Sequence, residues 1–217
     1  TDQDDGGIVK SSRKTITIPA RGALSKSMGS DIIANLFGVT SRSFGSILVE
    51  GDVNRIAAVG GVSAQVDPND ATKGLKTAQV NTLFLDSPEV MGVNEEERRF
   101  AGIEKSVQRR TNLILREVAG QSCRVRLRLY SAAGAKMGES TVDVAASQYR
   151  QINDVFGASG MALGDGPFQS VEVTAQVVSG SGRVVGVATV NDNISRNPEI
   201  FLLALPGPTD GGPWVGF

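Results

Sequence analysis

Three arginines in this sequence are spaced so that their side chains could bind a ligand together. Arg124, Arg126 and Arg128 occupy alternate positions of the segment 124–129, and apolar residues occupy the positions between them. In a strand the three guanidinium groups share one face, where their planar forks of donors suit phosphate, sulfate or uronate groups. The same alternation is typical of a solvated outer face over an apolar inner face. We expect the solvated face, with anion binding as the alternative.

The residue types that are missing exclude several kinds of catalysis. The 217 residues include no histidine and one cysteine, Cys123. The chain therefore has no Ser-His-Asp or Cys-His pair, no HExxH zinc site, no intrachain disulfide and no cysteine-based zinc site. For glycoside hydrolysis, no spacing selects one carboxylate pair among candidates such as Glu139 with Asp143 and Asp154 with Asp165. We expect a protein that is not an enzyme, in which Cys123 is a buried, unreactive thiol.

Acidic turns are the remaining candidates for ligands. Asp2, Asp4 and Asp5 precede two glycines, and carboxylates at such spacing can converge on a calcium ion. The segments 67–70 and 191–193 are acidic turns of the same kind. Aspartate and asparagine also populate turns for backbone reasons alone. We expect no cofactor, with calcium as the alternative.

The elements that would position these residues are mainly strands. Period-two alternation, β-branched residues and glycine-rich turns predict strands at 15–18, 46–50, 55–62, 111–116, 125–130, 141–144, 170–178 and 183–190. A helix is predicted at 30–37 and a single helical turn at 151–156. Many short strands separated by short turns favour an all-β sandwich or barrel. We find no apolar run long enough for a membrane-spanning helix, and the opening residues 1–7 resemble the interior of a loop, which fits a trimmed product without its leader.

The two halves of the sequence match each other in order. Segment 15–18 matches 141–144 at an offset of 126 residues, and segment 55–59 matches 183–187 at an offset of 128. This self-similarity predicts two copies of one β module whose matched segments superpose. The strands at 111–116 and 125–130 have no counterpart in the first copy, so we expect that copy to be truncated at its N-terminus. That the first copy is a smaller variant sheet stays open.

The predicted domain organisation follows from this repeat. We expect a first, incomplete module at 1–93, a solvated charged linker at 94–99, a second module at 100–206 and an extended tail at 207–217.

Four segments also resemble a known kind of module. They read RTNLIL at 110–115, VRLRLYSAAG at 125–134, YRQINDVF at 149–156 and GVATVNDNISRNP at 186–198. The pattern is similar to tandem Ig-like or fibronectin-like β-sandwich modules of large, mostly uncharacterised secreted proteins of environmental bacteria. The resemblance covers 97–206 and, more weakly, 12–92. It implies an extracellular or cell-surface scaffold of bacterial origin and assigns no catalytic residue.

The C-terminal tail suggests how such a scaffold assembles. Proline and glycine keep 207–217 extended, and the tail ends in the apolar residues Trp214, Val215 and Phe217. An incomplete sandwich exposes unpaired strand edges, which an extended segment can complete by strand addition. We therefore expect a structural module, a subunit of an extracellular fibre that self-assembles into filaments by donor-strand complementation. The subunit-contact candidates are those three residues.

The expected partners are other copies of the chain or an upstream fragment of its precursor. The net charge of −1 gives no reason to expect nucleic acid. The rival function is an accessory module of a secreted hydrolase that binds polysaccharide or another surface polymer. One tryptophan and two tyrosines provide few aromatic platforms for sugars, which weighs against this rival.

Overall fold

The computed structural model describes part of the chain, and this part is mostly strand. The described residues are 13–26, 28–38, 49, 51, 59–62, 78–81, 87–158, 160–161, 163–194 and 198–203. Their elements, in chain order, are η1 (Met28–Leu36), β1 (Val59–Val62), β2 (Ala78–Asn81), β3 (Arg98–Lys105), β4 (Arg109–Glu117), β5 (Cys123–Tyr130), β6 (Lys136–Val144), β7 (Tyr149–Ile152), η2 (Val155–Gly157), β8 (Phe168–Gly180), β9 (Val184–Asp192) and β10 (Pro198–Leu202). The expectation of a β-rich chain with little helix is confirmed.

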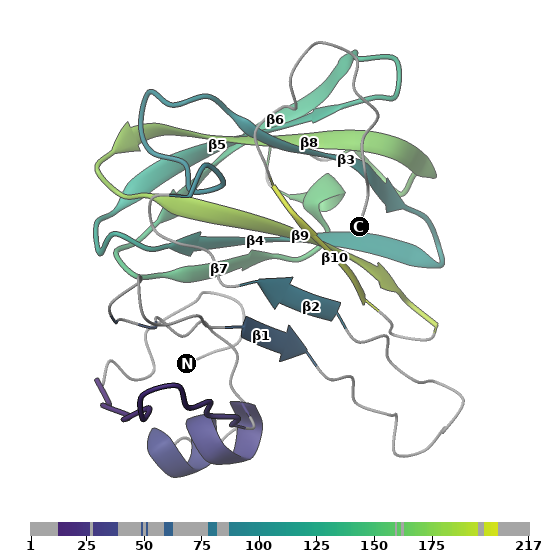
Figure 1. Cartoon of the computed structure of the whole chain (residues 1–217). Helices are drawn as coiled ribbons and strands as arrows, with labels where there is room; N and C mark the ends of the chain where they lie inside the picture. Colours follow the sequence, from purple (N-terminus) through teal and green to yellow (C-terminus); the bar gives the residue numbers. More distant parts are fainter. Residues whose placement is uncertain are drawn as a thin grey trace.

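Two four-stranded antiparallel sheets form the body of the molecule (Figure 1). One sheet has the strand order β10-β9-β4-β7 and the other has the order β3-β8-β5-β6. Most consecutive strands from β3 to β10 alternate between the sheets, whereas the β5–β6 and β9–β10 pairs stay within one sheet. This winding brings the inner faces of both sheets together.

The core lies between these two sheets. Val125, Leu127 and Leu129 of β5 are fully buried and join one apolar cluster with Leu113 and Leu115 of β4. Successive side chains of a strand point to opposite faces, so the buried positions of β5 place its arginines on the outside. The predicted alternation in 124–129 is therefore confirmed.

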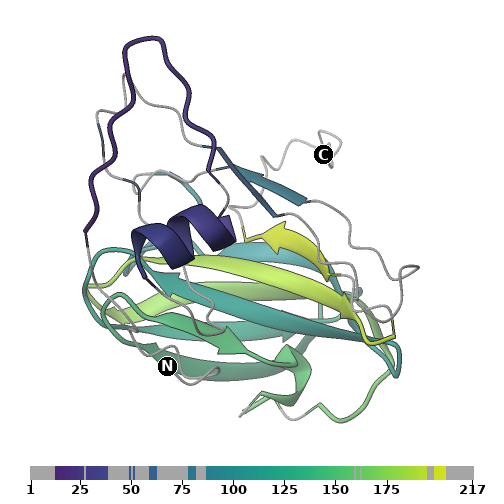
Figure 2. The ribbon, with the colours of Figure 1, turned by 90° about the horizontal axis from the view of Figure 1, so that it is seen from below.

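The N-terminal elements lie on one side of this body. In both views η1 and the β1–β2 pair lie on the outer side of the β10-β9-β4-β7 sheet (Figures 1 and 2). On that side the outward-facing residues Ile114, Val185 and Val187 are half-buried. Among the described residues, none of the helices is long and apolar enough to cross a membrane.

One predicted strand is wrong, and with it one equivalence of the internal repeat. Residues 15–18 are not in a strand, and the side chains of Ile16 and Ile18 are 48% and 39% exposed. The matched segment 141–144 lies in β6 and pairs with β5. A segment of alternating apolar and polar residues forms a strand only when a neighbouring strand completes its hydrogen-bond ladder. The sequence alone does not show whether that neighbour is present.

Other parts of the first predicted module are only partly described. The predicted helix at 30–37 is found as η1, where the Phe37 N–H donates to the Ile32 carbonyl, a π-type spacing of five residues. Residues 55–58 of the predicted strand at 55–62 lie outside the described residues, and Val59–Val62 forms β1. Most of the predicted strand at 46–50 also lies outside the described residues.

The charged segment 94–99 is not solvated throughout, which corrects the expectation of a solvated linker. Arg98 begins β3 and is only 4% exposed. Its guanidinium donates to the carbonyls of Pro88, Val90 and Glu96 and pairs with Glu95 at 3.1 Å. This arginine therefore stabilises the turn before β3.

Candidate functional site

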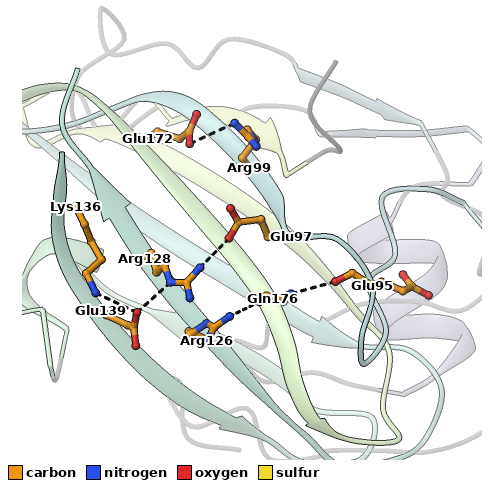
Figure 3. A network of polar contacts seen from close by, with 9 residues as sticks. All are labelled: Glu95, Glu97, Arg99, Arg126, Arg128, Lys136, Glu139, Glu172 and Gln176. Atoms are coloured by element: carbon orange, nitrogen blue, oxygen red, sulfur yellow. Dashed lines mark hydrogen bonds and ion pairs between the residues drawn. The ribbon is translucent and has the colours of Figure 1, made fainter. Parts of the chain in front are cut away.

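Arg126 and Arg128, two of the three arginines singled out by the sequence, lie on the outer face of the β3-β8-β5-β6 sheet (Figure 3), and Arg124 lies on the same face of β5. Arg124 is 53% exposed, whereas the side chain of Arg128 is 23% exposed and Arg126 is half-buried. All three lie on the solvent side of β5, but each has a partner from this chain.

Arg128 is the centre of a network that spans the sheet. Its Nε donates to Glu139 on β6 at 3.0 Å, and its Nη1 lies 3.4 Å from the Glu97 carboxylate just before β3. Lys136 also contacts Glu139, at 3.5 Å. The hydrogen bond from Arg128 holds the pKa of Glu139 below its ordinary value. The network therefore links segments on both sides of β8.

The burial of Thr174 on β8 indicates that the arginines of this network shield the outer face of the sheet from solvent. Its pleat position is outward, because its neighbours Val173 and Ala175 are fully buried in the core, yet Thr174 is only 1% exposed. Its register partners are Arg128 on β5 and Arg99 on β3. The long stems of the two arginines lie on either side of the threonine and exclude water from it.

Arg126 connects the same face to the turn before β3. Its Nη2 donates to the side-chain oxygen of Gln176 on β8, and the Gln176 amide donates to the Glu95 carbonyl at 3.2 Å. A neighbouring ion pair joins Arg99 to Glu172 at 3.8 Å. These contacts fix β3 and its preceding turn on the sheet.

Arg124 and Asp143 form a two-point ion pair at the end of this face. The guanidinium Nε and Nη2 lie 2.7 and 3.2 Å from the two carboxylate oxygens. This hydrogen bonding holds the pKa of Asp143 below its ordinary value. An anion that bound Arg124, Arg126 or Arg128 would have to displace a partner that is already present.

Glu117 is a buried carboxylate that the sequence predictions missed. It lies at the end of β4, is 0% exposed and faces inward, two positions after Leu115. Among the described residues, five backbone N–H groups donate to its two oxygens, those of Ala119, Gly120, Gln121, Ser147 and Arg183, at 2.7–3.2 Å. The period of two along 113, 115 and 117 was the signal that could have placed Glu117 inside.

The hydrogen bonds of Glu117 explain how its charge is tolerated. Burial raises the pKa of the Glu117 carboxyl, but the backbone hydrogen bonds lower it more, so its pKa lies below the ordinary value. Bonds to the ionised form favour that form. One side chain thus ties together the turns that follow β4, β6 and β8, and we name this arrangement the Glu117 latch.

A hollow of about 580 Å³ lies beside the Glu117 latch. It is lined by the first residues of β5, the end of β6, the turn between β6 and β7, Arg150 of β7 and the end of β8. Cys123, which also lines it, is buried as predicted. Burial, with the charge of Glu117 as the second cause, raises the pKa of the Cys123 thiol to about 11.

Only some of the acidic candidates lie in the part of the chain that the structure describes. Asp154 and Asp165 both face Lys105, whose Nζ lies 2.8 and 4.0 Å from their carboxylates. In the described part of the chain, no three His, Cys, Asp or Glu side chains gather as metal ligands. Asp2, Asp4, Asp5 and the segment 67–70 lie outside the described residues, as does the tail with Trp214, Val215 and Phe217.

Comparisons with known proteins add little to this geometry. No family model matches the chain, and no curated protein matches it. One solved structure, the crystal structure of Thermotoga maritima 1070, is similar at a TM-score of 0.39 and 9% sequence identity, over 50% of this chain and 90% of that chain. A likeness this low carries no argument about fold or function.

Proposed function

We propose that the chain is a non-catalytic structural module, secreted or displayed at a bacterial cell surface, and a subunit of an extracellular fibre. Within it, the second module at 100–206 would be an Ig-like β-sandwich, as the resemblance of 97–206 implies. Two facing sheets that share one apolar cluster support the sandwich. The incomplete tandem copy at 1–93 remains a prediction, but it no longer includes the equivalence of segment 15–18 with segment 141–144.

The observation that carries this proposal is how the charged side chains are used. Arg128, Glu97 and Glu139 connect strands of one sheet, and Glu117 connects three turns. A catalytic acid or base needs a proton within reach of substrate and a pKa near the working pH. Glu117 is instead saturated with backbone donors and its pKa is lowered, which suits a stabilising role.

The edges of the two sheets bear on how such a fibre would assemble. β3 is interrupted by two register shifts, β7 has only four residues, and β10 begins with Pro198. The segment at Gly160 runs along β6, where an added Cβ would lie 3.0 Å from the Glu139 carbonyl. Bulges, short strands, proline and covering loops all hinder strand addition. The acceptor would therefore lie in 1–93 and the donor in the tail 207–217.

The experiment compares the full chain with a variant lacking 207–217, using light scattering after size-exclusion chromatography and electron microscopy. We expect the full chain to form concentration-dependent filaments and the deletion variant to remain monomeric, with the circular dichroism of a folded β protein. A matched control is Val107→Ser, because Val107 is 96% exposed on the body and lies outside the tail; this variant should assemble normally. A monomeric full chain, or normal assembly of the deletion variant, would contradict the proposal.

A further inference from the structure

The hollow beside the Glu117 latch has the size of a small-molecule site. Its volume is about 580 Å³, and ligand sites in proteins usually span about 300–1,000 Å³. It lies at the rim of the body, between the end of the β5–β6 pair in one sheet and β7 in the other.

Arg150 points into the space between the two sheets. In the β4–β7 pair it is the register partner of Leu115, which is fully buried in the core. Directly opposed residues of antiparallel strands lie on the same face, so Arg150 faces inward at the edge strand β7. It is half-buried, and within the described part of the chain its Nε is buried without a hydrogen-bond partner. Since this Nε is closed to water while the hollow is empty, the part of Arg150 that lines the hollow is the rest of its side chain.

The charges around the hollow favour a ligand with one negative charge. Its lining residues include two guanidinium groups, of Arg124 and Arg150, and one carboxylate, of Asp143. Arg124 and Asp143 hold each other in a two-point ion pair, and Arg150 interacts with the same carboxylate through its charge, so the lining has one positive charge in excess. A doubly charged phosphate would face Asp143 with only one uncompensated guanidinium to balance it.

The remaining lining residues suit the rest of a sugar. Ser122 and Ser179 contribute hydroxyl groups, and the exposed Asp143 can accept from a ligand hydroxyl. The exposed Ala145 contributes apolar surface against which the carbon face of a pyranose ring can pack.

The Glu117 latch makes this wall rigid before any ligand arrives. Glu117 accepts from Gln121 and Ser147, which belong to the two turns on either side of the hollow. The Glu117 N–H in turn donates to the Gln148 carbonyl at 3.0 Å, and Gln148 lines the hollow. Binding groups that are fixed in advance lose less conformational entropy when the ligand binds.

We propose that this hollow binds a uronic acid residue, with the sugar carboxylate on Arg150 and sugar hydroxyls on Asp143 and the two serines. The carboxylate offsets the excess positive charge of the lining, which has two guanidinium groups and one carboxylate, and the hydroxyls distinguish a uronate from a simple carboxylate. This site goes beyond the proposed structural function and does not depend on it, because every residue it uses belongs to the described body.

The test titrates the full chain with galacturonate, glucuronate and trigalacturonate, followed by NMR of the backbone amides and by calorimetry. Glucose, acetate and inorganic phosphate serve as comparison ligands. We expect a uronate to shift the amides of 143–150 and to bind at least about tenfold more tightly than glucose or acetate, a difference of about one charged hydrogen bond. Tighter binding of trigalacturonate than of the monosaccharides would identify a polymer as the source of the uronate.

Arg150→Gln should lower the affinity for uronate by about tenfold or more. The matched control is Arg99→Gln, because the Nε of Arg99 is also buried without a partner but does not line the hollow. This control should bind uronate like the unchanged protein. Ser179→Ala, at an exposed position and without a change of charge, provides a second variant that should weaken uronate binding but not acetate binding.

Three results would overturn the proposal. One is that no uronate shifts the amides of 143–150 at concentrations where the protein remains folded. Another is that acetate or phosphate binds as tightly as the uronates. The third is that Arg150→Gln, with an unchanged thermal melt, binds uronate as well as Arg99→Gln does.

Discussion

The two ends of β4 are held in place in opposite ways. At its C-terminal end the Glu117 latch fixes three turns with one buried charge. At its N-terminal end the turns around Val107 and Asn193 meet at the surface: the Asn193 N–H donates to the Gln108 carbonyl at 2.6 Å, and its amide donates to the Val107 carbonyl at 3.2 Å. Exposed hydrogen bonds thus hold one end, and the bonds of a buried carboxylate hold the other.

This difference indicates which end of β4 contributes more to the free energy of unfolding. Water can replace an exposed hydrogen bond when it breaks, so its net contribution is small. A buried carboxylate has no such substitute, and removing it leaves several buried N–H groups unpaired. The latched end should therefore be sensitive to single substitutions, and the end at Asn193 should tolerate them.

The largest effect is expected for Glu117→Gln. The amide keeps the size of the side chain but loses the charge, and one of its terminal groups is a donor facing backbone donors. We expect the free energy of unfolding to fall by roughly 3 kcal/mol or more, measured by urea denaturation at pH 7. The exposed Glu139→Gln is the control and should change it far less. Equal effects of the two substitutions would show that the latch has no special role.

The pH dependence of stability should follow the same carboxylate. The folded-state pKa of Glu117 lies below its ordinary value, so its contribution is complete above the unfolded-state pKa of about 4.3 and is lost as the pH falls toward the folded-state pKa. In urea melts, the stability difference between the unchanged protein and Glu117→Gln should therefore stay the same from pH 7 to about 5 and shrink as the pH is lowered from about 5 to about 3. A difference that stays constant over this range would contradict the assignment.

A smaller effect is expected at the other end of β4. Asn193→Ala removes the side-chain bond to the Val107 carbonyl and the oxygen that accepts from Arg110. Both bonds are exposed, so we expect a loss of about 1 kcal/mol in the same urea measurement. Gln108→Ala, in the turn that Asn193 holds, should have almost no effect. A loss as large as that of Glu117→Gln would remove the contrast between the two ends.

The smallest effect is expected on the outer face. Arg128→Gln removes two ion pairs of a partly exposed side chain, and such pairs contribute about 0.5 kcal/mol in total after screening by solvent. The difference should shrink further in 1 M salt, because the Debye length falls to about 3 Å. A loss that does not depend on salt would mean that packing over Thr174, and not charge, is the contribution of Arg128.

The sequence predicted the strands that carry their own alternation but not the contacts between distant segments. β4, β5, β8 and β9 were predicted close to their positions because their inward residues repeat every second position. β3 was missed because charged residues stand at both its ends and Gly102 interrupts it.

The candidate site shows the same limit. The outward direction of Arg124, Arg126 and Arg128 followed from local pattern, but their partners lie on other strands. The donors of Glu117 come from three turns as far away as Arg183, and Arg150 faces inward only through its register with Leu115. Register and turn contacts depend on the assembled sheets, so a single sequence does not determine them.

The Glu117 latch also limits how this chain can change in length over evolution. The carboxylate reaches backbone groups in three turns at once, so an inserted or deleted residue in any of them would move a donor away from its oxygens. The turn at Val107 has no such restriction, and its side chain projects almost entirely into solvent. Natural length variation, and peptides grafted by an engineer, should therefore accumulate around Val107 and Ile194, while the three latched turns keep a constant number of residues.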